Sequence, residues 1–171
     1  MRGHGPADFT ELVLDTCSRL LALSDLGIDV AEGRRRAEAA VADGSAEAAW
    51  RRWLEAQGGT ADESALELAP VVREVVADGS GAVTRLGAVA VGSAALHLGA
   101  GRRTKDDEID HAVGVVCHRK RGDAVTAGDV LAEVHARDEA SAVAGVAEVA
   151  AAYELGDEPP PAQSVLLEVI E

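Results

Sequence analysis

Aromatic side chains are scarce in this 171-residue chain, which contains two Trp, one Tyr and one Phe. A core cannot form around large rings here, so it must be assembled mainly from Ala, Val, Leu and Ile. These small side chains fill space in small steps, so their backbones must approach one another closely. Hydrophobic residues still make up 47% of the chain. The composition therefore predicts one compact domain, or a small domain with an attached helical piece.

Positive charge is also in short supply, because 16 Lys and Arg face 30 Asp and Glu, for a formal net charge of -14. Binding to nucleic acid needs basic side chains that neutralise phosphates, and binding to an anionic membrane surface needs the same charge. No apolar run reaches the 18 residues or so that suggest a bilayer-spanning helix. We therefore expect no nucleic-acid partner and no membrane partner.

Cysteine occurs only twice, at Cys17 and Cys117, and the two match no metal-binding or redox spacing. Both lie in apolar stretches, which predicts buried free thiols of the kind found in a reducing cytosol. The first residues, Met-Arg-Gly-His-Gly-Pro, contain no apolar signal core. The expected location is the cytoplasm.

The first part of the chain has helical patterning. Apolar residues recur at helical spacing from residue 7 to 24, after the start signal Pro6 and Asp8. A second helix is predicted over 30–42. A third helix is predicted to begin at Ser45, its N-cap candidate, and to end at Gln57 before two glycines. Together they predict a helical segment over 1–66 that buries little apolar surface alone.

The remainder, from 70 to 171, has mixed character and predicts an α+β domain. β-branched runs flanked by turn residues indicate strands, and alanine-rich stretches indicate helices. The predicted strands are 71–77, 82–86 and 113–117, two short strands around Gly128-Asp129, and 165–170; the predicted helices are 87–98 and 139–153.

Several patterns that could carry chemistry do not fit their motifs. The Gly99-Ala100-Gly101 pair follows a helix instead of a strand, so it indicates a helix stop and not a dinucleotide loop. The acidic run 106–110 lacks the glycine of a calcium-binding EF-hand loop. Cys117 and His118 are neighbours on a predicted strand, so they point to opposite faces and cannot easily pair.

A more informative pattern lies over 122–134, where Gly122 and Gly128 are interspersed with apolar residues at 125, 131 and 134. This spacing resembles the hammerhead, or barrel-sandwich, fold of biotinyl and lipoyl carriers, with glycines in tight turns. A carrier needs a lysine on an exposed hairpin as its acylation point. Only Lys105 and Lys120 are present, and neither has the sequence setting of such a lysine. The pattern favours the fold and argues against carrier function.

Four segments, in order, resemble one enzyme family. They are Gly3 to Leu12 (GHGPADFTEL), Ala56 to Gly59 (AQGG), Leu98 to Gly114 (LGAGR, then Lys105, Asp107, Ile109-Asp110 and Val113-Gly114), and Gly122 to Ala136 (GD…V…G…L…VHA). This set is similar to the C-terminal portion of pyrimidine-nucleoside (thymidine) phosphorylases. The resemblance implies an N-terminal helical segment, 1–66, followed by an α/β-hammerhead (barrel-sandwich-like) domain over 70–171.

The resemblance also implies an activity, the phosphorolysis of thymidine, uridine or deoxyuridine to free base and pentose 1-phosphate. In that family phosphate attacks the anomeric carbon while positioned charges stabilise the departing base. Members are dimers of a helical and a larger α/β domain that close over a cleft. The segments that hold phosphate and base lie upstream of the matched stretch, so no catalytic, cofactor-binding or metal-binding residue transfers to this chain.

What transfers instead is a scaffold and a loop. The LGAGR loop predicts a closure or domain-contact role for Arg102, Lys105, Asp107 and Asp110. We expect the chain to be inactive alone, to pair with an upstream phosphorylase portion or to self-associate, and to meet phosphate and pyrimidine nucleoside only in a complete enzyme. A non-catalytic binding or scaffold module that reuses the hammerhead fold is the alternative.

Overall fold

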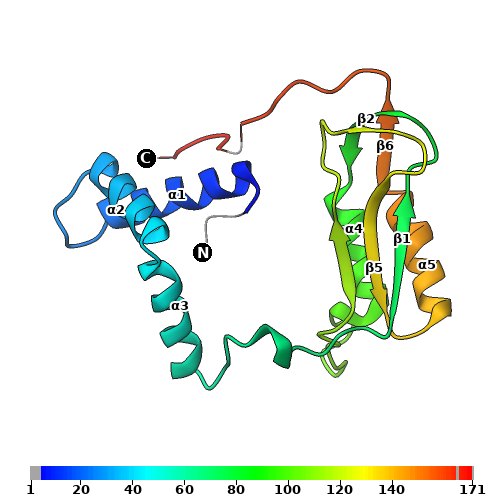
Figure 1. Cartoon of the computed structure of the whole chain (residues 1–171), viewed down its shortest axis with the longest axis horizontal. Helices are drawn as coiled ribbons and strands as arrows, with labels where there is room; N and C mark the ends of the chain where they lie inside the picture. Colours follow the sequence, from blue (N-terminus) through cyan, green and yellow to red (C-terminus); the bar gives the residue numbers. More distant parts are fainter. Residues whose placement is uncertain (1–4, 165, 171) are drawn as a thin grey trace. The chain divides into compact units, whose positions relative to one another are not determined.

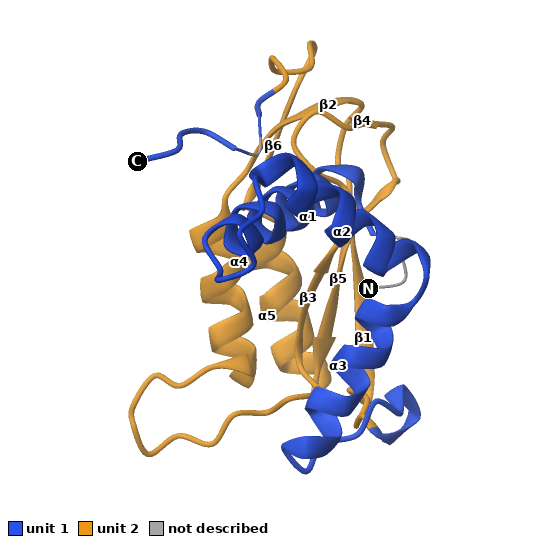
Figure 2. Ribbon diagram, turned by 90° about the vertical axis from the view of Figure 1, so that its left-hand side faces the viewer, with its two compact units in different colours: residues 1–65, 163–171 blue, residues 66–162 orange. Residues whose placement is uncertain are grey.

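The computed structural model describes residues 5–164 and 166–170 (Figure 1). It divides into two compact units, coloured separately in Figure 2. The helical unit comprises Met1–Ala65 with Gln163–Glu171, and the sheet unit comprises Leu66–Ala162. The α+β class expected from the sequence is confirmed, since helices and two small antiparallel sheets are both present.

The helical unit contains α1 (Ala7–Ala22), α2 (Val30–Ala42), α3 (Ser45–Ala56) and the short 3₁₀ turn η1 (Glu63–Ala65). The first two helices pack against each other. Their closest approach uses small residues: Ser18 is 1% exposed, and a Cβ on Gly33 would lie 2.5 Å from the Ser18 carbonyl oxygen. The pair therefore depends on the missing side chain at Gly33.

Local signals explain where these helices begin. Asp29 caps α2, because its side chain accepts a 2.7 Å hydrogen bond from the Glu32 amide. The expectation that Ser45 caps α3 is wrong. Gly44 occupies the cap with φ +78°, and the Asp43 side chain accepts from the Ser45 amide, so Ser45 is the first helical residue.

The sheet unit has two three-stranded antiparallel sheets. One has the order β1-β5-β3 and the other β4-β2-β6. The strands are β1 (Val71–Val76), β2 (Gly81–Leu86), β3 (Gly114–Cys117), β4 (Ala124–Val125), β5 (Val130–Ala136) and β6 (Tyr153–Gly156).

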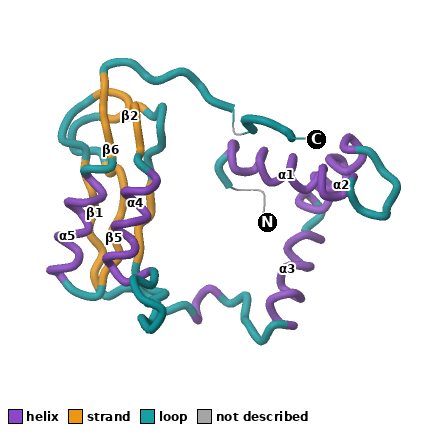
Figure 3. Tube along the Cα trace, turned by 180° about the vertical axis from the view of Figure 1, so that it is seen from behind, coloured by secondary structure: helices purple, strands orange, loops and turns teal. Residues whose placement is uncertain are grey.

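Two helices cover the first sheet. They are α4 (Ala88–Ala95), which continues into the π-turn η2 (Leu96–Ala100), and α5 (Glu139–Ala150). The tube in Figure 3 shows them side by side along the strands. The helix α5 packs on β1 and β5, while α4 packs on α5 and β3. A Cβ on Gly145 would lie 2.9 Å from Val134, so α5 also approaches its sheet closely.

The core of the sheet unit is aliphatic, as the scarcity of aromatics requires. Its fully buried side chains include Val75, Val83, Val134 and Val149. Tyr153, the only tyrosine, is 9% exposed and joins the same cluster. Burial against this core accounts for most of the stability we expect of the unit.

Two sequence predictions about the C-terminal region are wrong. The helix expected over 139–153 ends at Ala150, and after a two-residue turn Tyr153 begins β6, which pairs with β2 through Tyr153↔Leu86. The final strand expected over 165–170 is not formed by residues 166–170, and residue 165 lies outside the described residues.

The two cysteines, Cys17 and Cys117, are free, as expected. Both are half-buried, so the expectation that they are buried is wrong.

Candidate functional site

The loop that follows η2, residues 101–112, carries the four residues singled out by sequence. Just before it, within η2, Gly99 has a φ of +108° that suits glycine and ends the regular helical path. The Asp110 amide donates a 3.0 Å hydrogen bond to the Gly99 carbonyl, which brings the two ends of the loop together. The loop is thus a closed excursion from the sheet unit and not an extended linker.

Asp107 organises the tip of this loop. Its carboxylate accepts hydrogen bonds from the Arg103 amide at 2.9 Å and the Thr104 amide at 3.1 Å, and from the Thr104 hydroxyl at 2.6 Å. The Thr104 hydroxyl, followed by these amides, holds the pKa of the Asp107 carboxyl below its usual range. Asp107 is therefore committed to the loop's own backbone.

Asp110 organises the base of the loop. Its carboxylate accepts a fork of two hydrogen bonds from the Arg137 guanidinium, at 2.5 and 2.8 Å, and one from the Ala112 amide at 3.0 Å. The Arg137 hydrogen bonds, and then the Ala112 amide, lower the pKa of the Asp110 carboxyl. A forked arginine–carboxylate pair fixes direction as well as distance.

Arg102 and Lys105 differ from the two aspartates, because both are exposed and neither has a hydrogen bond or ion pair within residues 5–164 and 166–170. The structure therefore separates the four predicted residues. Asp107 and Asp110 shape the loop, while the two basic side chains are free to meet another surface.

Sequence reasoning missed Arg137, the residue that holds the base of the loop. It follows β5 directly and is separated from Asp110 by 27 positions and from its second partner, Glu67, by 70. No spacing rule connects residues so far apart. The one available signal was its place beside the quoted Val134-His135-Ala136 segment.

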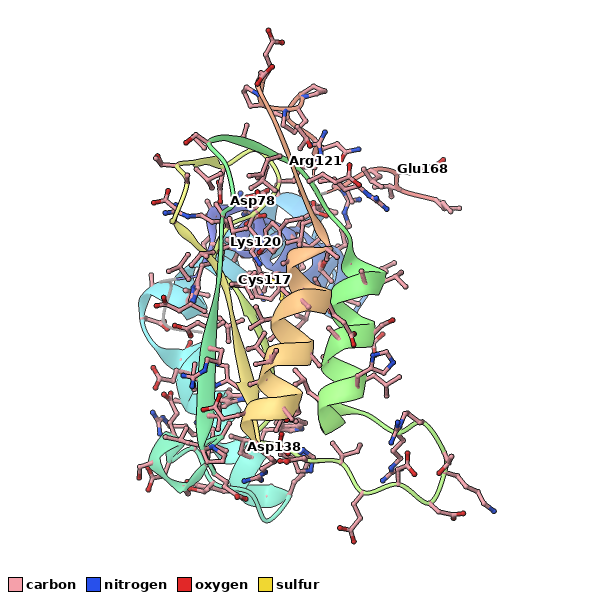
Figure 4. All side chains as sticks on the ribbon, turned by 90° about the vertical axis from the view of Figure 1, so that its right-hand side faces the viewer. Asp78, Cys117, Lys120, Arg121, Asp138 and Glu168 are labelled. Carbon is pink, nitrogen blue, oxygen red and sulfur yellow. The ribbon has the colours of Figure 1, made fainter. Side chains whose placement is uncertain are left out.

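Another reactive side chain of the sheet unit, Tyr153, makes contacts that hold the fold together. The Tyr153 hydroxyl lies 3.0 Å from the Leu131 carbonyl and 3.1 Å from the Arg119 carbonyl, which ties the turn after β3 to β5. Burial, with Cys117 beside it, raises the pKa of Tyr153. Figure 4 labels Cys117 and Lys120 near this end of the unit and Asp138 at the opposite end of α5.

Histidines contact carboxylates at two places. His97 Nδ1 lies 2.8 Å from Glu148, which joins η2 to α5. The Nε2 atoms of His118 and His135 lie 3.5 and 3.6 Å from the same Glu133 oxygen, too far for hydrogen bonds of normal length. Over the described part of the chain, no three His, Cys, Asp or Glu side chains form a group that could hold a metal ion.

No helix in the described ranges is both long enough and apolar enough to cross a bilayer. The helical unit instead carries an apolar groove of about 600 Å³ between α1 and α2. Its lining includes Phe9, Val13, Leu20 and Val41. Phe9 is 59% exposed and Leu20 62% exposed, so the groove is open to solvent.

Comparison with known proteins gives a consistent match. Residues 82–156 match the family described as pyrimidine nucleoside phosphorylase C-terminal domain. The chain is 41% identical over 143 residues to a pyrimidine-nucleoside phosphorylase of Geobacillus stearothermophilus, covering 81% of this chain and 33% of that protein. The namesake proteins of Staphylococcus haemolyticus (strain JCSC1435) and Bacillus subtilis (strain 168) are 40% and 37% identical over the same shares.

The chain thus spans about one third of the length of the curated relatives it matches. The family match covers β2 to β6, and so includes the loop 101–112 and its anchor Arg137. The resemblance read from the four sequence segments is confirmed: this chain is similar to the C-terminal domain of pyrimidine-nucleoside phosphorylases.

Proposed function

We propose that this chain serves as the C-terminal part of a pyrimidine-nucleoside phosphorylase. In the complete enzyme, phosphate would cleave thymidine, uridine or deoxyuridine to free base and pentose 1-phosphate, a pentosyl transfer in the cytoplasm. The chain would contribute the hammerhead scaffold and the loop 101–112, and it would be inactive alone. The observation that carries this proposal is the 41% identity over 143 residues to a phosphorylase of which it spans one third.

The separation of roles within the loop supports the closure proposal. Asp107 and Asp110 hold the loop in one shape, so its exposed cations, Arg102 and Lys105 among them, are presented without the cost of ordering a flexible segment. Exposed cations on a rigid loop can pair with carboxylates or phosphate groups of a facing surface. We propose that they contact the remainder of the enzyme as it closes on substrate.

The groove between α1 and α2 supports the proposed partner. An open apolar surface of this kind marks an interaction site in a soluble protein. We propose that the upstream portion of the phosphorylase, on the same or a separate chain, covers it. Without that portion we expect the chain to self-associate through the same groove.

The test is an assay for phosphate-dependent cleavage of thymidine and uridine by the purified chain. It is run with the chain alone and after mixing with the upstream portion of a related phosphorylase. We expect activity only on mixing, and weaker activity from the double variant Arg102→Ala/Lys105→Ala. The variant Arg85→Ala, which removes an exposed cation on β2 instead, is the matched control.

The outcomes separate the hypotheses. Activity of the chain alone would show that the catalytic residues lie within it, against the proposal. If neither the chain alone nor the mixture is active although the two portions are shown to bind each other, a non-catalytic scaffold module would be favoured. Equal rates for the double variant and the control would remove the closure role of the loop while leaving the scaffold role intact.

A further inference from the structure

Arg137 holds two carboxylates that come from segments far apart in the chain. Its Nε and one terminal nitrogen donate to Asp110, and the other terminal nitrogen donates to Glu67 at 2.6 Å. The guanidinium is planar and rigid, so its two edges keep a fixed relation to each other. A shift of either carboxylate therefore changes the geometry available to the other.

The Asp110 contact controls the loop. Within the described ranges, the hydrogen bonds of residues 102–107 stay inside the loop, whereas Asp110 bonds Ala112 at the end of the loop and joins the loop to Gly99 and Arg137. Of these, only Arg137 belongs to a distant strand end. Among the described residues, it makes the one ion pair between the loop and the end of the central strand β5.

The Glu67 contact controls the connector. Glu67 is the second residue of the sheet unit, between η1 and the first residue of β1, Val71. Its side chain is 70% exposed, against 23% for Asp110. The exposed contact is the weaker of the two, because water and salt screen it more.

We propose that Arg137 is a positioning residue that couples the connector 66–70 to the loop 101–112. The Glu67 contact restricts the rotamers of the Arg137 side chain. The guanidinium then loses less freedom when it binds Asp110. When the connector moves and Glu67 withdraws, the base of the loop loosens. The coupling belongs to the sheet unit and does not depend on any enzymatic activity.

Limited trypsin digestion of the full chain tests this coupling, because the loop contains three cleavage sites at Arg102, Arg103 and Lys105. Cleavage of a transiently opened segment follows the population of its open form when closing is fast. We expect Arg137→Gln to raise cleavage in the loop about threefold to tenfold. Glu67→Gln should raise it about twofold. The double variant should match Arg137→Gln, because Glu67 acts only through Arg137.

Two controls make the result specific. Arg73→Gln removes another forked pair, with Glu139 at 2.6 and 3.1 Å, without touching the loop, and should leave loop cleavage unchanged. The turn 119–121 supplies three further trypsin sites in the same unit, and these report global opening.

Three results would overturn the proposal. One is unchanged trypsin cleavage of the loop in Glu67→Gln, a variant that should fold normally because Glu67 is exposed. Another is a Glu67→Gln effect that persists in the Arg137→Gln background. The third is an increase in trypsin cleavage at 119–121 as large as the increase in the loop, which would mean that Arg137 stabilises the whole unit. If Arg137→Gln does not fold, Arg137→Lys replaces it and should show part of the loop effect only.

Discussion

The two units of this chain handle apolar side chains in opposite ways. In the sheet unit, Val75, Val83, Val134 and Val149 are fully buried between sheets and helices. In the helical unit, the one fully buried side chain among the described residues is the polar Ser18, while Leu23 is 84% exposed. Sheet layers covered by helices enclose a volume, whereas two packed helices offer only a seam. The share of hydrophobic residues alone therefore does not say which unit can bury its apolar side chains without a partner.

The largest expected effect is in the core of the sheet unit. Val134→Ala removes two methyl groups from a site with no exposure and should lower the free energy of unfolding by about 2–3 kcal/mol. Val13→Ala in the open groove, where Val13 is 39% exposed, should cost about 1 kcal/mol or less. Equal costs at the two sites would break the contrast between the units.

The two units can be followed separately in this experiment. Both tryptophans, Trp50 and Trp53, lie in α3, so tryptophan emission reports the helical unit. Tyr153 lies in the core of the sheet unit. Denaturant titrations followed by both signals should show Val134→Ala in the tyrosine signal and in far-UV circular dichroism.

Next in size is the helix seam. Gly33→Ala places a Cβ 2.5 Å from the Ser18 carbonyl oxygen, so the helices must separate, at a cost of about 1–3 kcal/mol in the tryptophan-reported transition. Gly92→Ala in α4 is the matched control, because no atom lies within 4 Å of its added Cβ. The control should be neutral or stabilise by up to about 1 kcal/mol. A neutral Gly33→Ala would show that α1 and α2 do not need this close approach.

A smaller effect is expected at Tyr153. Tyr153→Phe removes the hydroxyl that meets two carbonyls, but the Leu131 carbonyl also accepts from the His118 and Arg119 amides. Because one acceptor keeps other partners, we expect a loss of about 1 kcal/mol by thermal or denaturant unfolding. A loss above about 3 kcal/mol would mean that the ring moves when the hydroxyl is removed.

The smallest effect concerns acid pH and the loop. The pKa values of Asp107 and Asp110 lie below the usual 3.8 in the folded chain. Their hydrogen bonds therefore contribute fully above the unfolded value and are lost as the pH falls through the folded values. Amide exchange of the loop, corrected for its intrinsic pH dependence, should quicken about twofold to fivefold between pH 5 and pH 3. In Asp110→Asn this pH dependence should be smaller, and an unchanged profile would contradict the assignment.

The helices of the first unit were predictable because their signals are local. The bounds of α2 follow from Asp29 before it and Asp43-Gly44 after it, and the structure has the helix expected there. The strands β1 and β2 follow from β-branched runs around the turn at Asp78. Signals of this kind need no knowledge of distant partners.

The cap of α3 was missed for a local reason, since Gly44 and not Ser45 occupies it, but the other misses depend on distant partners. Tyr153 continues an alanine-rich helical pattern, yet it forms β6 because β2 offers a backbone partner at Leu86, 67 positions away by number. Leu166 to Ile170 have strand-like composition but no pairing strand in the described chain. Arg137 could not be identified as a loop anchor, because its partners become neighbours only in the folded unit.

The division of the chain has a consequence for its synthesis. The segment from Gln163 onward groups with the helices before residue 66. Along the sequence, the whole sheet unit is therefore inserted between two parts of the helical unit. A ribosome releases residues in order, and domains generally fold as they emerge. The sheet unit can complete its contacts while its neighbour still lacks its last segment. The apolar groove between α1 and α2 emerges before the sheet unit, so it is available to chaperones or to other nascent chains while the rest of the chain is made.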